Sequence, residues 1–375
     1  MAIVITAFNA SGQVGDVIER RHEVTLPEAH VGDLEIDTRL LDSFEKPDKD
    51  TRQFYLDARA VFSKLKDADF THPEIIKAAQ KQGLALMGGP LLGQLSESGA
   101  VLWVRPSGAI PLQVKVAAVD GSGVKTYRSG PLQPGKEQRI VLDNLSGGSG
   151  YTYAVYAGTQ KVGEGRFKTA PSAEDEGLFR VAFGSCFHKI GLHNPNLINR
   201  IIEREPQVMM LLGDLAVDDR EDNIGMHRSD YLLRDASKAW QRLAANVPLY
   251  AAWDDHDFLN NDLSGIPERF TAADREALRA VWQQNWNNPK SHGEGIYFST
   301  RTGPVELIML DTRSCRTVTE RGEYGSYLGL EQQEWLKKTL KNSTAPYKII
   351  SSGTMWSDYV TNGKDSWGTW DTLAR

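Results

Sequence analysis

The spacing of apolar residues first distinguishes an N-terminal extension over residues 1–85. Its polarity is mixed, but apolar side chains recur at helical spacing between Thr51 and Leu65. The predicted helix turns one apolar face inward, formed by Phe54, Ala58, Val61, Phe62 and Leu65. Because an amphipathic helix buries such a face, we expect the extension to pack against the rest of the chain.

Residues 86–172 show the shorter rhythm of β-strands. Alternating runs at 99–104, 112–119, 138–142 and 151–156 are separated by Gly, Pro and Ser. Short strands at this spacing predict a small β-sandwich of the fibronectin III or immunoglobulin type. We assign no chemistry to it.

Residues 176–375 show a third pattern, in which apolar runs alternate with amphipathic segments. Strands are predicted at 178–183, 208–212, 247–253, 305–310 and 347–350, and helices at 196–205, 273–286 and 331–340. The first two strands and their helix predict a β-α-β unit buried on both faces. The chain is therefore predicted to be multidomain, ending in an α/β domain.

Composition excludes several classes of protein. The 375 residues include 43 basic and 49 acidic side chains, a net charge of −6 without a long basic run, so nucleic acid is not an expected partner. No apolar stretch approaches the roughly 20 residues of a membrane span. The opening residues lack the features of an export signal. We expect a cytoplasmic chain, or a periplasmic or extracellular one if a signal has been removed.

Metal-binding residue types follow the predicted strands. Ligands gather at the carboxyl ends of strands in an α/β sheet. The segments found there are Gly184-Ser-Cys-Phe-His188, Gly213-Asp214, Asp254-Asp-His-Asp257 and Asp311-Thr-Arg313. Both cysteines, Cys186 and Cys315, are interpreted as thiols, because two cysteines make no disulfide framework.

The first two of these segments each allow two interpretations. Cys186 and His188 are two residues apart, so in extended backbone both side chains face one ion. The alternative is a buried thiol beside a surface imidazole. Asp214 follows an apolar strand, where a buried carboxylate is costly unless it is paired or metal-bound. The alternative is a helix N-cap.

The other two segments are also ambiguous. Within Asp254–Asp257, three carboxylates surround His256 and would repel each other without a cation. The alternative is a solvated acidic turn. Arg313 and Arg316 are positioned to hold phosphate oxygens, unless they form ordinary surface ion pairs.

Together the segments predict two cations bridged by Asp214, an arrangement suited to phosphoryl transfer. A metal-bound hydroxide would attack phosphorus. His256 would then donate a proton to the leaving oxygen or stabilise the equatorial charge.

The chain resembles the PhoD-like alkaline phosphatases and phosphodiesterases of the calcineurin-like metallophosphoesterase superfamily over about residues 86–375. The motifs that carry the resemblance are Phe183-Gly-Ser-Cys186, Leu212-Gly-Asp214, Trp253-Asp-Asp-His-Asp257 with Asn260-Asn261, Leu310-Asp-Thr-Arg313, Leu328-Gly-Leu-Glu-Gln-Gln-Glu-Trp-Leu336 and Ser351-Ser-Gly-Thr-Met-Trp356. The resemblance implies Cys186 as a thiolate ligand, Asp214 as the bridge, Asp255 as a ligand of the second ion and Asn261 near that ion. It implies iron with calcium, or another divalent ion such as zinc or manganese.

The chain departs from the family pattern in two places. Family members carry a tyrosine, and relatives an aspartate, three residues after the bridge, where this chain has Val217 followed by Asp218. The family's last aspartate-histidine motif has no counterpart, since no histidine follows His292. We therefore expect a C-terminally incomplete fragment, in which residues 366–375 begin a helix. If instead the chain is complete, His227 or His292 would complete the site.

The resulting prediction is a metal-dependent hydrolase of phosphate mono- or diesters, acting on a small phosphate ester at a dinuclear site. The alternative is a catalytically silent relative that acts as a binding module. A serine hydrolase built on Ser185 is disfavoured, because the Gly-x-Ser-x-Gly elbow is missing.

Overall fold

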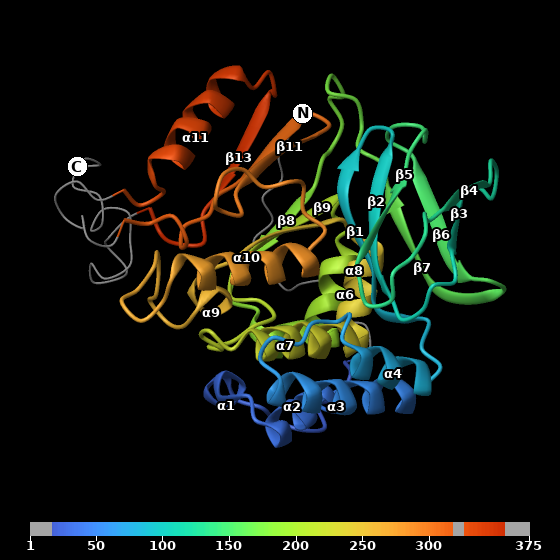
Figure 1. The fold of residues 1–375 in the computed structure, drawn as a ribbon. Coiled ribbons are helices and arrows are strands. Elements are labelled where there is room, and N and C mark those ends of the chain that lie inside the picture. The colour runs from blue at the N-terminus through green and yellow to red at the C-terminus, as the bar shows by residue number, and fades with distance from the viewer. Residues whose placement is uncertain (1–16, 318–325, 357–375) are drawn as a thin grey trace.

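The computed structural model describes residues 17–317 and 326–356 (Figure 1). In chain order the elements are α1 (Leu26–Val31), α2 (Leu34–Leu41), α3 (Lys49–Lys64), α4 (Pro73–Lys81), β1 (Leu86–Ser96), β2 (Gly99–Pro106), β3 (Leu112–Ala118), β4 (Lys125–Arg128), β5 (Gln138–Leu142), β6 (Gly150–Ala157), β7 (Gln160–Lys168), β8 (Val181–Gly184), α5 (His188–Leu192), α6 (Pro195–Glu203), β9 (Val208–Leu212), α7 (Ile224–Ala236), α8 (Lys238–Asn246), β10 (Leu249–Ala252), α9 (Asp255–Phe258), α10 (Ala272–Asn285), β11 (Phe298–Thr302), β12 (Val305–Met309), α11 (Leu330–Asn342) and β13 (Tyr347–Ser351). The predicted helix start at 366–375 lies outside the described residues.

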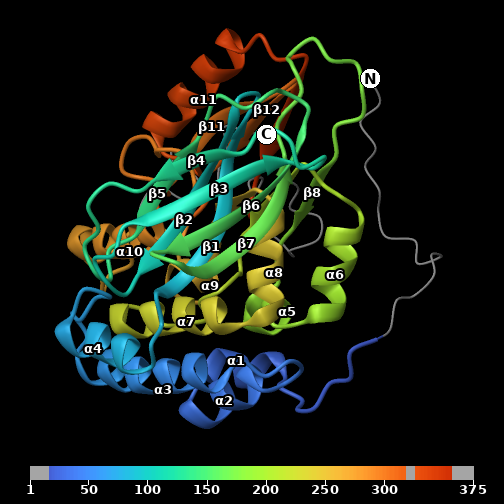
Figure 2. The ribbon, with the colours of Figure 1, turned by 90° about the vertical axis from the view of Figure 1, so that its right-hand side faces the viewer.

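Helices α1–α4 of the extension gather at one end of the molecule, with α7 between them and the sheets (Figures 1 and 2). The predicted helix is confirmed as α3, which begins where the Asp48 side chain accepts a hydrogen bond from the Thr51 amide. Its apolar residues Phe54 and Phe62 are buried in a cluster that includes Leu233 of α7. Leu65 was wrongly assigned to this face: it follows the end of α3 and is 44% exposed.

Two antiparallel sheets cover residues 86–168, with strand orders β1-β2-β5 and β4-β3-β6-β7. The four predicted strands correspond to β2, β3, β5 and β6, whereas β1, β4 and β7 were missed. Strand β7 is mostly polar and exposed, so its sequence carries little apolar alternation. The β-sandwich assignment and the domain boundaries at 85 and 172 remain predictions.

The last part of the chain contains two further sheets. Strands β8, β9 and β10 are parallel in the order β10-β9-β8, and the second sheet has the order β11-β12-β13. The central strand β9 is buried, but β8 lies at an edge of the described sheet, where Phe183 is 60% exposed. The prediction that this β-α-β unit is buried on both faces was therefore wrong for β8. Helices α7 and α8 and strand β11 were not predicted.

Buried side chains join these parts into a common core. One hydrophobic cluster contains Leu102 of β2, Val155 of β6, Met210 of β9 and Trp253 beyond β10. No described helix is long and apolar enough to cross a membrane. The packing brings the loops that follow β8, β9 and β10 together at one edge of their sheet, where the candidate site lies.

Candidate metal centre

The loops after β8 and β9 turn sharply, and each carries a site residue in left-handed backbone conformation. The φ angles are 55° at Cys186, 47° at His188, 53° at Asp214 and 50° at Asp219. Hydrogen bonds join the loops: the Cys186 amide donates to the Gly213 carbonyl at 3.0 Å, and the His188 amide to the Asp214 carbonyl at 2.7 Å. The extended backbone predicted for Cys186 and His188 is therefore wrong. Non-glycine residues in this conformation are strained and cluster at functional sites.

A first group of potential ligands combines Cys186, His188 and Asp214, whose ligand atoms lie within 4.8 Å of one another. The Cys186 Sγ is 3.3 Å from Asp214 Oδ2, and His188 Nε2 is 4.0 Å from the same oxygen. The alternative interpretation is wrong on both counts, because the thiol is exposed and the imidazole is buried.

A second group combines Asp214, Asp255 and His256, so Asp214 belongs to both. Asp214 caps no described helix, which removes the N-cap interpretation. Its Oδ1 is buried and has no hydrogen-bond partner among the described residues. Burial, and then the charge of Asp255, raise the pKa of Asp214. A cation would satisfy the buried oxygen and offset the repulsion, so these residues fit a metal centre bridged by Asp214.

The Asp254–Asp257 segment is not a solvated turn, because all three of its carboxylates are buried. Asp257 Oδ1 accepts a hydrogen bond from the Leu215 amide at 2.9 Å, which fastens the segment to the loop that carries Asp214. Burial raises the pKa of Asp257 well above its usual range, and raises that of Asp254 to about 6 although the charge of Arg313 opposes this.

Arg313 is also buried rather than part of a surface ion pair. Its Nε donates to Asp254 Oδ1, and its Nη2 lies 3.5 Å from Asp255 Oδ1. Arg316 is 4% exposed, and its Nη2 donates to the Tyr327 hydroxyl at 2.5 Å. Asn261 is exposed, and its amide donates to Asn260 Oδ1 at 2.6 Å. Its proximity to a second ion remains a prediction.

Two carboxylates after β9 orient the two site histidines. Asp218 Oδ1 is 2.7 Å from His188 Nδ1, and Asp219 Oδ1 is 2.5 Å from His256 Nδ1. Burial favours the neutral ring of each histidine, but the hydrogen bonds to these carboxylates and the nearby negative charges outweigh it. They raise the pKa of His188 to about 10 and that of His256 to about 9. The pairing leaves Nε2 of His188 directed at Asp214.

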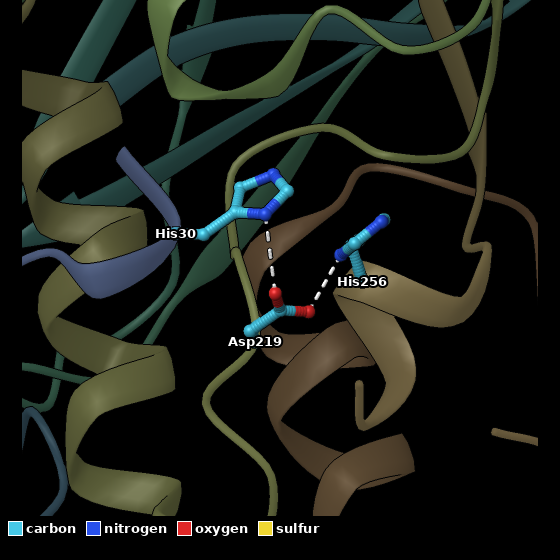
Figure 3. A group of neighbouring side chains, drawn as sticks. All are labelled: His30, Asp219 and His256. Carbon is cyan, nitrogen blue, oxygen red and sulfur yellow. Dashed lines mark hydrogen bonds and ion pairs between the residues drawn. The ribbon is translucent and has the colours of Figure 1, made fainter. Parts of the chain in front are cut away.

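A third imidazole, that of His30 in helix α1, lies at the site and was not predicted from the sequence. His30 Nδ1 lies 3.2 Å from Asp219 Oδ2, so the Asp219 carboxylate sits between His30 and His256 (Figure 3). No periodicity or motif near His30 predicts its contact with Asp219, because the two residues are 189 positions apart and meet only through the packing of the extension. The residues proposed to complete the site, His227 and His292, belong to none of the ligand groups among the described residues. His227 Nε2 instead lies 2.9 Å from the Glu221 carbonyl, and His292 stacks on Tyr297.

Comparisons with known proteins bear on the family and the fold. Residues 200–372 match the model of a family described as PhoD-like phosphatase. A solved structure of PhoD is 20% identical to this chain, with a TM-score of 0.58. The match covers 71% of this chain and 62% of the PhoD chain. The structure of purple acid phosphatase PPD1 from yellow lupin (Lupinus luteus) seeds is 17% identical, with a TM-score of 0.55. The match covers 76% of this chain and 54% of the phosphatase chain.

The chain thus spans less than two thirds of the length of both structures, and at these identities the likeness concerns the fold. No curated protein matches the chain.

Proposed function

Because residues 200–372 match the model of the PhoD-like phosphatase family, we propose that this protein hydrolyses phosphate esters at a centre holding two metal ions. The observation that carries the proposal is that two groups of potential ligands share the buried carboxylate of Asp214. The proposed substrate is a small phosphate mono- or diester. A shared carboxylate would hold two cations close enough to act on one phosphate.

The donor types suggest different ions on the two sides of Asp214. Cys186 and His188 provide a thiolate and an imidazole, which suit a transition metal such as iron or zinc. Asp255 provides oxygen, with Asn261 as a further proposed ligand, and oxygen donors suit calcium or manganese. When bound, such ions supply Lewis-acid stabilisation of the phosphate oxygens and activate water.

His256 is the proposed proton donor to the leaving oxygen. Asp219 holds its Nδ1 at 2.5 Å, and Figure 3 shows the other ring nitrogen pointing away from Asp219. This hydrogen bond orients the ring so that Nε2 is available to a substrate.

Arg313 is the proposed phosphate-binding group. Asp254 fixes its guanidinium beside Asp255, and the planar guanidinium fork is the side-chain group best matched to the oxygens of a phosphate.

The Asp214→Asn variant tests this proposal. We expect it to abolish hydrolysis of nitrophenyl and alkyl phosphate mono- and diesters and to release at least one ion, measured by elemental analysis. A neutral amide does not bridge two cations as a carboxylate does. Asp50→Asn, which alters an exposed carboxyl on α3, is the control and should change neither property. Full activity and metal content in Asp214→Asn would refute the bridge.

Measurements on the unmodified protein separate the proposal from its alternative. If the chain binds no metal and hydrolyses none of these esters, the proposed function is wrong and the silent binding module is favoured.

A further inference from the structure

We propose that His30 of the N-terminal extension is a positioning residue of the catalytic centre, holding the Asp219 carboxylate against His256. The inference rests on the proposed function, in which His256 is the proton donor. His30 would then contribute a side chain of the N-terminal extension to a centre whose other named residues lie between Cys186 and Arg313.

Both oxygens of the Asp219 carboxylate face an imidazole. Its Oδ1 is 2.5 Å from His256 Nδ1, and its Oδ2 is 3.2 Å from His30 Nδ1 (Figure 3). Each oxygen therefore faces one imidazole nitrogen, and the two rings lie 4.6 Å apart between centroids. A carboxylate held at both oxygens has a single orientation, whereas one held only by His256 is free to rotate or tilt.

The same imidazole also approaches Asp218, the carboxylate that orients His188. His30 Nε2 is 3.9 Å from Asp218 Oδ1, the oxygen that binds His188 Nδ1. One side chain of the extension thus lies beside both carboxylates that orient the site histidines, although its Nε2 makes no hydrogen bond among the described residues.

Backbone contacts also fix the position of His30 relative to Asp219. Helix α1 ends at Gly32, whose carbonyl accepts hydrogen bonds from Arg220 Nη2 at 3.1 Å and from Arg59 Nη2 at 3.0 Å. Arg220 directly follows Asp219, so a second contact two residues beyond His30 holds the same two segments together. A Cβ at Gly32 would lie 2.2 Å from Arg220 Nη2, and the φ of Gly32 is +54°, so a side chain there would disrupt this approach.

The central test is a comparison of substitutions at His30. His30→Ala should lower kcat by about 10- to 100-fold, the usual effect of losing a residue that orients a site group, with little change in KM. His30→Asn places an amide N–H near the former Nδ1 and should restore much of the loss. His30→Gln fills similar space but places its amide near the former Nε2, so it should not.

Controls distinguish positioning from general damage. His22→Ala alters an exposed histidine of the same extension and should leave kcat unchanged. His30→Ala combined with Asp219→Asn should be little worse than Asp219→Asn alone, because both changes act through the same Asp219 carboxylate. Equal losses in His30→Asn and His30→Gln, or full kcat in His30→Ala, would overturn the proposal.

A measurement independent of turnover separates this inference from the proposed function. The full chain has eight histidines, so imidazole nitrogens can be observed by ¹⁵N NMR in zinc-loaded, histidine-labelled protein. The Nδ1 proton of His256, identified by its loss in His256→Ala, should exchange faster with solvent in His30→Asn than in the parent and fastest in His30→Gln and His30→Ala. It should be unchanged in His22→Ala. If the parent hydrolyses no ester, the proposed function fails, and an unaltered His256 signal in His30→Ala would show that the positioning contact fails as well.

Discussion

Replacing Asp37 with alanine should destabilise the fold by about 3–5 kcal/mol, the usual cost of leaving a buried charge without its partner. Asp37 is fully buried on α2, in the seam between the extension and the site. Its Oδ2 accepts a hydrogen bond from Arg59 Nε at 3.0 Å, its Oδ1 lies 3.6 Å from Lys189 Nζ, and Arg220 Nη2 is 3.8 Å away.

The magnitude follows from the balance of charge in this network. Three cations, Arg59, Lys189 and Arg220, share the carboxylates of Asp37 and Asp230, because Asp230 binds Arg220 at 2.7 Å and lies 3.6 Å from Lys189. Removal of Asp37 leaves the three cations with one carboxylate. Lys189 is 1% exposed, so bulk solvent does not reach its ammonium group to replace the lost partner.

Urea unfolding at pH 7, followed by the fluorescence of the nine tryptophans, measures the effect. Lys66→Ala is the matched control, because the Lys66–Asp222 ion pair also joins the extension to the later half but is about half exposed on both sides. It should cost at most about 1 kcal/mol. Lys189→Met added to Asp37→Ala should recover part of the loss, since it removes a cation left unpaired. An Asp37→Ala cost no larger than that of Lys66→Ala would refute this account of the network.

Three further predictions concern the site and the response to pH. His256→Ala should lower turnover by roughly 100-fold through loss of acid catalysis, with a smaller loss for nitrophenyl than for alkyl esters; equal losses would contradict the proton-donor role. Cys186→Ser should change the metal content measured by elemental analysis without unfolding the chain, and unchanged iron or zinc would argue against a thiolate ligand. Burial lowers the pKa of His193 and of His227 from 6.5 to about 4, so between these values the unfolded chain binds more protons than the folded one. Stability should therefore fall as the pH drops from 6.5 toward 4, by up to about 2.7 kcal/mol per pH unit, and His193→Gln with His227→Gln should reduce this slope in urea titrations at several pH values.

Local sequence patterns predicted the positions of most strands and of three helices in the α/β part. Strand β9 is a continuous apolar run because it is buried between two neighbours, and α10 shows the spacing of a helix packed on one side. Strand β7 and helix α7, whose apolar patterns are weaker, were not predicted. Strand β7 is mostly exposed, and in α7 polar residues such as Asp230 and Arg234 are buried in ion pairs. A buried polar residue is indistinguishable from a solvated one in the sequence alone.

The sequence by itself also indicated that the residues following β8, β9 and β10 would lie near one another. The reason is that the loops after parallel strands meet at one edge of the sheet. The segments that carry Cys186, Asp214 and Asp255 were identified in this way, and the family resemblance singled out Asp255 within its segment. In the structure Cys186 and Asp255 belong to two groups of potential ligands that share Asp214.

Only the tertiary structure decided how these residues are oriented and what surrounds them. Cys186 and His188 adopt left-handed backbone conformation instead of the predicted extended one, with the thiol exposed and the imidazole buried. The contact between His30 and Asp219 joins segments 189 positions apart, and the buried carboxylate of Asp37 links the same extension to Lys189 and Arg220. Such contacts are set by the balance of burial and charge pairing over the whole fold, and no local stretch of sequence encodes that balance.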